Sequence, residues 1–158
     1  MIYKRENIND LYNQNFHDWR IKHMTMCPNS EVHLLLEEGP QGQEKRLFFR
    51  NYLGFQASNI QPWSSVNGFA TFSENGIKAH PVAPEINHID IVTDVCYLIN
   101  TMRIRNRDNL EITYDSIFTQ YGRKIDLSTY FGITILLSSG DTIDIITDEM
   151  EIRSGENL

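Results

Sequence analysis

The stretch FGITILLSSGDTIDIIT, residues 131–147, decides the fold of this chain. Apolar residues recur at every second position on both sides of the turn at 138–141: Phe131, Ile133, Ile135, Leu137, Ile143 and Ile145. Successive side chains of a strand point to opposite faces, so this spacing predicts two strands that each bury one face. Gly140 in the turn favours an antiparallel hairpin between them.

The same alternation continues outward from this hairpin. Apolar residues alternate in the same way in three further segments, 19–26, 32–37 and 47–53. Turn residues at 28–30 and 39–42 separate these segments. This order predicts a three-stranded antiparallel meander. Two further hairpins are predicted at 69–80 and 102–114. A short helix is predicted at 7–12: Asn7 would cap its N-terminus, and Ile8, Leu11 and Tyr12 would form its apolar face. The predicted fold class is mainly β: an antiparallel curved sheet, sandwich or partly closed barrel with one short N-terminal helix.

Two segments are harder to assign. Pro62 interrupts any strand ladder, which predicts a loop at 61–65. Between residues 84 and 100 the apolar positions fit either a helix or a strand. The β-branched residues Ile89, Ile91 and Val95 favour the strand.

The composition is that of an ordinary globular protein. Of 158 residues, 41% are hydrophobic and 22% charged, which predicts one domain, residues 1–158, that needs no disulfide or metal for stability. The two cysteines, Cys27 and Cys96, lie outside any CxxC motif, and we expect free thiols in a reducing cytosol. No apolar run is long enough to span a bilayer and the N-terminus does not resemble a signal peptide. The sequence therefore predicts a soluble, cytoplasmic protein.

Negative charge is concentrated near the C-terminus. The net charge is −7, and residues 141–158 hold six acids and one base, Arg153. Such a pole repels nucleic acid and anionic membranes and attracts a basic protein surface through long-range steering. A solvated acidic edge without any partner is the alternative. The residues expected to contact a protein partner are Asp141, Asp144, Asp148, Glu149 and Glu151.

Motifs of catalysis and cofactor binding are absent from the sequence. It contains no phosphate-binding glycine loop, dinucleotide fingerprint, nucleophile elbow or HExxH zinc motif, so we expect no cofactor and no catalytic residues. His17, His23 and His33 are close in sequence, and the last two lie on strands predicted to pair. A zinc site would also need a cysteine or carboxylate within reach. We therefore expect separate surface histidines and no metal.

Two polar patterns have structural interpretations. Neighbouring strand residues point to opposite faces, so His17 and Asp18 are not expected to form an acid–base pair. Asp18 is expected instead to tie the N-terminal helix to the first strand. Arg103, Arg105 and Arg107 would share one strand face. That stripe could bind an anion, but cross-strand pairing with acids such as those at 111 and 115 is favoured.

Three stretches resemble a known group of proteins. They are FHDWRI at 16–21, RLFFRNYLGFQ at 46–56 and FGITILLSSGDTIDIITDEMEI at 131–152. Together they resemble a loose group of small β-rich bacterial proteins, several of which are assigned as immunity proteins of polymorphic or contact-dependent toxin systems. The resemblance implies a cytoplasmic antidote that binds and neutralises one cognate toxin. The group has no shared catalytic set to transfer to this chain.

The sequence thus predicts a non-enzymatic protein-binding module, most concretely an immunity protein whose partner is a basic toxin domain. One alternative is a small-molecule-binding β-barrel or sandwich, which would enclose an aromatic cavity. The other is a hydrolase or transferase of unrecognised type, for which His17, Asp18 and His33 are the candidate residues.

Overall fold

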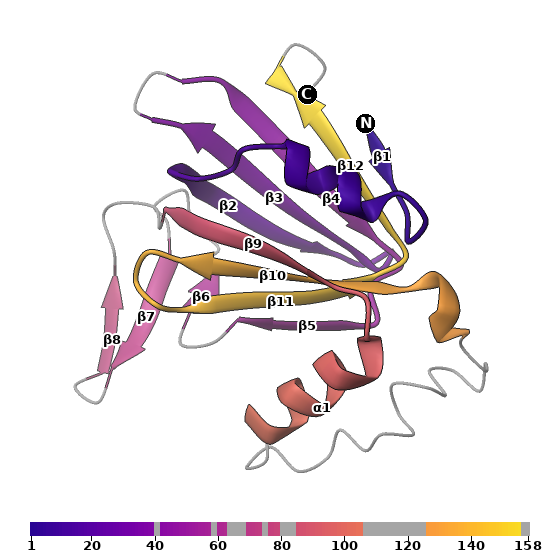
Figure 1. Ribbon diagram of the computed structural model, residues 1–158. Helices are drawn as coiled ribbons and strands as arrows, with labels where there is room; N and C mark the ends of the chain where they lie inside the picture. Colours follow the sequence, from indigo (N-terminus) through magenta and orange to yellow (C-terminus); the bar gives the residue numbers. More distant parts are fainter. Residues whose placement is uncertain are drawn as a thin grey trace.

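Two antiparallel sheets form the body of the protein (Figure 1). The computed structural model describes residues 1–39, 42–57, 60–62, 69–73, 76–79, 85–105 and 126–155. In the five-stranded sheet the order is β1 (Ile2–Tyr3), β12 (Glu149–Ser154), β4 (Glu44–Arg50), β3 (Glu31–Glu38) and β2 (Trp19–Cys27). In the four-stranded sheet it is β5 (Gly54–Ala57), β11 (Thr142–Thr147), β10 (Phe131–Leu137) and β9 (Ile86–Val92). A smaller sheet contains β6 (Ile60–Pro62), β7 (Phe69–Ser73) and β8 (Gly76–Ala79).

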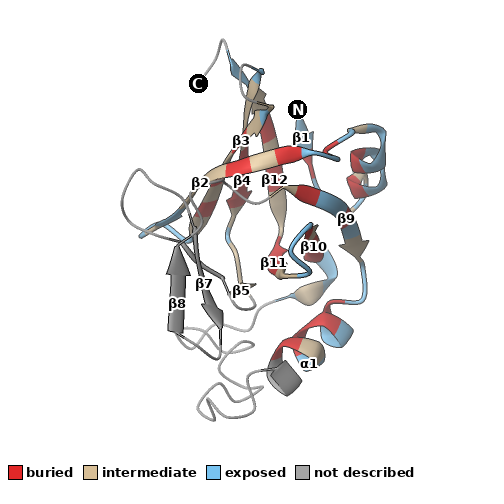
Figure 2. Cartoon of the chain, turned by 90° about the vertical axis from the view of Figure 1, so that its left-hand side faces the viewer, coloured by how far each residue is buried: buried red, intermediate tan, exposed pale blue. Residues whose placement is uncertain are grey.

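The inward faces of the two larger sheets share one hydrophobic core (Figure 2). The alternating residues of the 131–147 hairpin are buried there, as predicted, against alternating residues of β3, β4 and β12. The 3-10 helix η1 (Ile8–Asn13) contributes Ile8 and Leu11 to the same core. The predicted mainly-β class, the meander of β2, β3 and β4, and the hairpins β7–β8 and β10–β11 are confirmed.

The two larger sheets are joined at one corner. There β4 leads into β5 through residues 51–53, and β11 leads into β12 through Asp148. The hydroxyl of Thr147 donates to the carbonyl of Arg50, and the side-chain amide of Asn51 donates to both carboxylate oxygens of Asp148 at 3.2 Å. These contacts link segments that are 97 residues apart in sequence.

A bulge changes the side-chain pattern of β2. The pairing with β3 shifts register between Ile21 and His23. Ile21 is fully buried, whereas His23 and Thr25 pair with Leu35 and His33. A β-bulge inserts one residue and reverses the faces that follow it. The alternation predicted over residues 19–26 would place Ile21, His23 and Thr25 on one face, and it is therefore wrong beyond the bulge.

The predicted strand at 84–100 is partly wrong. Strand β9 ends at Val92, and helix α1 (Val95–Arg105) follows, with the side chain of Asp94 accepting a hydrogen bond from the backbone N–H of Tyr97 at 3.0 Å. An Asp at this position satisfies a free N–H of the first helical turn. Four apolar residues of α1 are buried together: Val95, Leu98, Ile99 and Met102. No helix in the described part of the chain is long and apolar enough to cross a bilayer.

Because α1 extends to Arg105, the expected hairpin at 102–114 does not begin at Met102. Arg103 and Arg105 are two helical positions apart, about 200° around the axis, so they do not share a face. Residues 107–115 of this expectation lie outside the described residues.

Three smaller expectations also fail. Pro62 ends strand β6 rather than lying in a loop, and β6 is at the edge of its sheet, where a missing N–H is tolerated. Tyr12 is 55% exposed, because a 3-10 helix has three residues per turn and aligns Ile8 with Leu11 only. Asn7 stands at the N-cap position of η1 without making a side-chain capping hydrogen bond.

Candidate functional site

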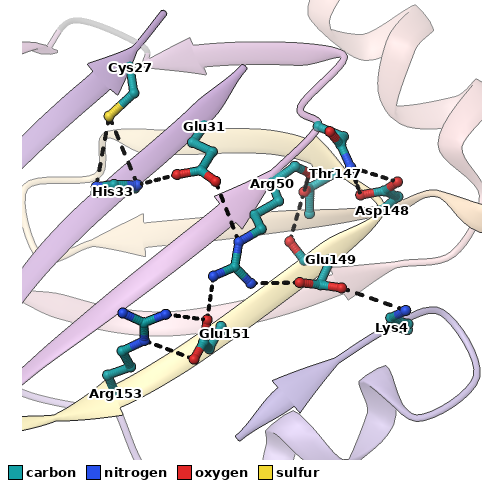
Figure 3. A network of polar contacts seen from close by, with 11 residues as sticks. Lys4, Cys27, Glu31, His33, Arg50, Thr147, Asp148, Glu149, Glu151 and Arg153 are labelled. Atoms are coloured by element: carbon teal, nitrogen blue, oxygen red, sulfur yellow. Dashed lines mark hydrogen bonds and ion pairs between the residues drawn. The ribbon is translucent and has the colours of Figure 1, made fainter. Parts of the chain in front are cut away.

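The outward side of the five-stranded sheet holds the densest group of charged side chains that the structure describes (Figure 3). The strand register brings them together: Glu149 pairs with Arg50, Glu151 with Phe48 and, on the next strand, Phe48 with His33. We call this surface the ion-pair face. Its members are Glu31, His33, Phe48, Arg50, Glu149, Glu151 and Arg153.

Arg50 is the centre of the ion-pair face. Its guanidinium lies against three carboxylates from two strands, β12 and β3: Nη1 donates to Glu149 at 2.6 Å, Nη2 donates to Glu151, and Nε is 3.4 Å from Glu31. A planar guanidinium has donors in a fixed fork and can satisfy several carboxylates at once. Lys4 Nζ extends the network, at 3.6 Å from Glu149.

Phe48 is buried although it points away from the core. The guanidinium of Arg153 lies 4.5 Å from the centre of its ring, and the ring of His33 lies 4.5 Å away in an edge-on arrangement. Only 8% of Phe48 is exposed. Arg153 in turn donates two hydrogen bonds to Glu151, at 2.8 and 3.0 Å. Arg153 and His33 therefore cover an aromatic ring, and Glu151 holds Arg153 in place.

The electrostatics of the ion-pair face keep its groups charged. Hydrogen bonds from Arg153 and then Arg50 lower the pKa of Glu151 to about 2. The hydrogen bond to His33 is the largest cause that lowers the pKa of Glu31, and Arg50 adds to it. Glu151 chiefly, with Glu149, raises the pKa of Arg50. These shifts favour the charged forms of Glu31, Arg50 and Glu151 near neutral pH.

A cysteine, a histidine and a glutamate meet at one end of this face. Cys27 Sγ lies 3.8 Å from His33 Nδ1 and 3.9 Å from Nε2, while His33 Nε2 lies 2.8 Å from Glu31 Oε2. Cys27 pairs with Glu31 across the turn at 28–30. This contact could have been predicted from the sequence. The short turn fixes the register that pairs Cys27 with Glu31, and His33 follows Glu31 by two residues and therefore lies on the same face of the strand. Among the described residues no set of three or more ligands could hold a metal ion.

An acidic hollow of about 610 Å³ adjoins the ion-pair face. Three acids, Glu6, Asp148 and Glu149, line it together with the two bases Lys4 and Arg5. Burial raises the pKa of Asp148, and the nearby charge of Glu149 adds to the effect. Burial disfavours the charged form of the Asp148 carboxyl group, and a nearby cation would stabilise that form. The position therefore favours the approach of a cation.

The structure divides the five acids predicted to contact a partner. Glu149 and Glu151 belong to the ion-pair face, and Asp148 lies beside it. Asp141 lies at the opposite end of β11, roughly 20 Å away along the strand, where it accepts a hydrogen bond from Ser139 at 2.7 Å. Asp144 is only 1% exposed, so its assignment to a partner surface is wrong.

The sequence-based interpretation of His17 and Asp18 is also wrong. His17 Nδ1 lies 3.0 Å from Asp18 Oδ1, because Asp18 has a positive φ of 66° and belongs to a turn instead of a strand. Asp18 contacts β9 through its backbone N–H, which donates to the carbonyl of Ile86. A hollow of about 320 Å³ beside the pair is lined by His17 and His88, and His88 lies 2.8 Å from Asp90. All four of these side chains are more than half exposed.

Of the expectations for the three histidines, the structure confirms that two of them lie on paired strands. His23 and His33 lie on the paired strands β2 and β3, as predicted, while His17 precedes β2. Both hollows are lined mainly by polar residues and differ from the enclosed aromatic cavity of the ligand-binding alternative.

Comparison with known proteins found no match: no family model, no curated protein and no solved structure is similar to this chain. The geometry of the molecule itself therefore has to support any functional assignment.

Proposed function

We propose that this protein is a non-enzymatic protein-binding module that docks a basic partner against the ion-pair face and the adjoining acidic hollow. The observation that carries the proposal is Arg50, held by Glu31, Glu149 and Glu151 over the outward side of the sheet. This arrangement makes the surface polar and fixes its charged side chains before any partner arrives.

An ordered surface reduces the cost of association. Immobilising a flexible side chain at an interface costs about 0.5–1.5 kcal/mol. Arg50 and Arg153 are already fixed by their carboxylates, so much of this cost falls on folding instead of binding. Arginine and aromatic residues are also the types enriched in protein interfaces. Phe48, lying beneath Arg153 and His33, gives the face an apolar centre.

Charge favours a basic partner. The chain has a net charge of −7. Within the ion-pair face the acids and bases are largely matched, and the hollow beside it has a small excess of negative charge, with three acids against the bases Lys4 and Arg5. A lysine or arginine of a partner entering this hollow would meet Asp148 and Glu149. Such complementarity accelerates association and selects partners.

A cytoplasmic immunity protein that neutralises a toxin domain is the concrete form of this proposal. Two of the stretches that resemble such proteins are paired in the fold: 46–56 supplies β4 and β5, and 131–152 supplies β11 and most of β12. The resemblance therefore lies on one continuous part of the molecule, which includes most of the ion-pair face.

The test compares three forms of the tagged protein in cells that produce it. These are the unaltered chain, the double variant Asp148→Asn/Glu149→Gln and the control Asp141→Asn, which removes a charge at the far end of β11. We expect the unaltered chain and the control to retain one basic protein in equal amounts. The double variant should retain less of it, and its association rate with the purified partner should depend less on salt.

Growth assays then test the toxin assignment. Expression of the retained protein alone should arrest growth, and co-expression of this chain should restore it. Retention of no basic protein, or equal retention by all three forms, would contradict docking at this surface. A retained partner that is harmless when expressed alone would contradict the immunity function while leaving protein binding intact.

A further inference from the structure

We infer that Cys27 is a nucleophilic thiol that exchanges with low-molecular-weight disulfides, with His33 as its proton acceptor and Glu31 as the residue that positions His33. This inference is independent of the proposed docking function. It places a modification site at the end of the ion-pair face, beside the turn at 28–30 that connects β2 and β3.

The geometry contains the three parts of an activated thiol. Cys27 Sγ is within 3.9 Å of both ring nitrogens of His33, and Glu31 Oε2 is 2.8 Å from Nε2. With the Nε2 proton directed at Glu31, Nδ1 is left with a free lone pair 3.8 Å from the sulfur. A nucleophile, a base and a group that orients the base is the pattern that activates cysteine in proteins.

The surroundings fix the base in place. From β4, Phe48 lies against the ring of His33 at 4.5 Å, and Arg50 Nε lies 3.4 Å from Glu31. From β12, Glu151 and Arg153 belong to the same network and are bonded to each other. Glu31 therefore remains an acceptor for His33, and an imidazolium formed on His33 would lie beside a carboxylate that stabilises it.

The exchange step balances without any added oxidant. The Cys27 proton passes to His33, and the thiolate attacks one sulfur of a disulfide R–S–S–R. A new Cys27–S–S–R bond forms, the original S–S bond breaks and R–S⁻ leaves. Cys27 is only partly buried, so a small disulfide can approach it. The other cysteine, Cys96, is exposed on α1 and has no hydrogen-bond or ion-pair partner among the residues that the structure describes.

The experiment measures the reaction of the folded protein with 4,4′-dithiodipyridine, a small disulfide whose leaving group absorbs light. A Cys96→Ser background leaves Cys27 as the reporting thiol. His33→Gln and Glu31→Gln are introduced into this background. The matched control is His23→Gln, which removes a histidine from the same strand pair but not from the thiol cluster. Far-ultraviolet circular dichroism confirms that each variant is folded.

We expect His33→Gln to slow the reaction about tenfold at about pH 6, because a thiol without a base is mostly protonated there. Glu31→Gln should slow it by a smaller factor, and His23→Gln should leave it unchanged. The effect of His33→Gln should fade by about pH 9, where thiols ionise without help. A purely structural role for His33 would instead change the rate equally at every pH.

Two results would overturn the inference. One is a Cys27 rate that is the same with and without His33 at about pH 6. The other is a rate in the folded Cys96→Ser protein no higher at that pH than in the same protein unfolded by guanidinium, where the thiol is fully exposed.

Discussion

Thr134 and Asp144 face each other across strands β10 and β11, and the Thr134 hydroxyl donates to Asp144 Oδ1 at 2.7 Å. Asp144 is 1% exposed and Thr134 is partly buried, so the acceptor of this hydrogen bond is shielded from water. Thr134→Val keeps the shape of the side chain but removes the donor. We expect it to lower the free energy of unfolding by about 1–3 kcal/mol, the usual cost of removing a hydrogen bond from a buried acceptor. Urea denaturation at neutral pH measures the change.

The control for this prediction is Thr134→Ser, which retains the hydroxyl and should destabilise the protein less than the valine. If valine and serine have the same effect, methyl packing rather than the hydrogen bond to Asp144 explains the stability.

The ion pairs of Glu151 make stability depend on pH. Arg153 and Arg50 lower its pKa from 4.5 to about 2, so the stabilisation is complete above 4.5 and is lost as the pH falls toward 2. Glu151→Gln should therefore be less stable than the unaltered chain at about pH 6, by on the order of 3 kcal/mol. The two proteins should converge at about pH 2. A difference that persists at that pH would contradict this electrostatic origin.

Phe48 should behave as a core residue despite its position on the outward side of the sheet. It is 8% exposed and lies beneath Arg153 and His33. We expect Phe48→Ala to cost about 3 kcal/mol, at the lower end of the range for buried phenylalanine. The comparison is Leu35→Ala, at the neighbouring outward position of β3, which is only partly buried and should cost less. Equal effects in thermal unfolding would mean that the charged layer does not seal Phe48 from water.

Gly132 allows α1 to lie close to β10. A Cβ atom at this position would be 2.2 Å from Leu98 Cδ2 and 3.2 Å from Val92 Cβ. Gly132→Ala should destabilise the protein by about 1–3 kcal/mol through overpacking. In the double variant Gly132→Ala/Leu98→Ala the new methyl group enters the space that leucine leaves. Its loss of stability should be smaller than the sum of the two single losses. Additive losses would contradict direct contact between the two positions.

The strands with the clearest alternation were predictable, and the reason is physical. In β10 and β11 one face meets the core along the whole strand, so burial is visible as a period of two. Helix α1 was missed because its β-branched residues favour a strand locally. Yet Val95, Leu98, Ile99 and Met102 also follow helical spacing behind Asp94, and the shared burial of these residues decided the outcome.

The candidate site was less predictable than the fold. Glu149 and Glu151 were recognised as acids, but their shared partner Arg50 depends on β12 pairing with β4, about 100 residues away in sequence. A long-range register cannot be read from alternation alone. The local contact between Cys27, His33 and Glu31 could have been found, since only one short turn separates the two strands.

The position of β12 has a consequence for how the chain folds. This strand is the last described element in sequence, yet it lies between β1 and β4, and the amino group of Met1 donates to the carbonyl of Ile152. High contact order of this kind slows folding, so refolding in stopped-flow experiments should take milliseconds to seconds. A nascent chain that has not yet added residues 149–154 would present β4 as an open strand edge carrying Leu47 and Phe49. During synthesis such an edge can pair with other chains, and the final strand therefore protects the protein from aggregation as well as completing its sheet.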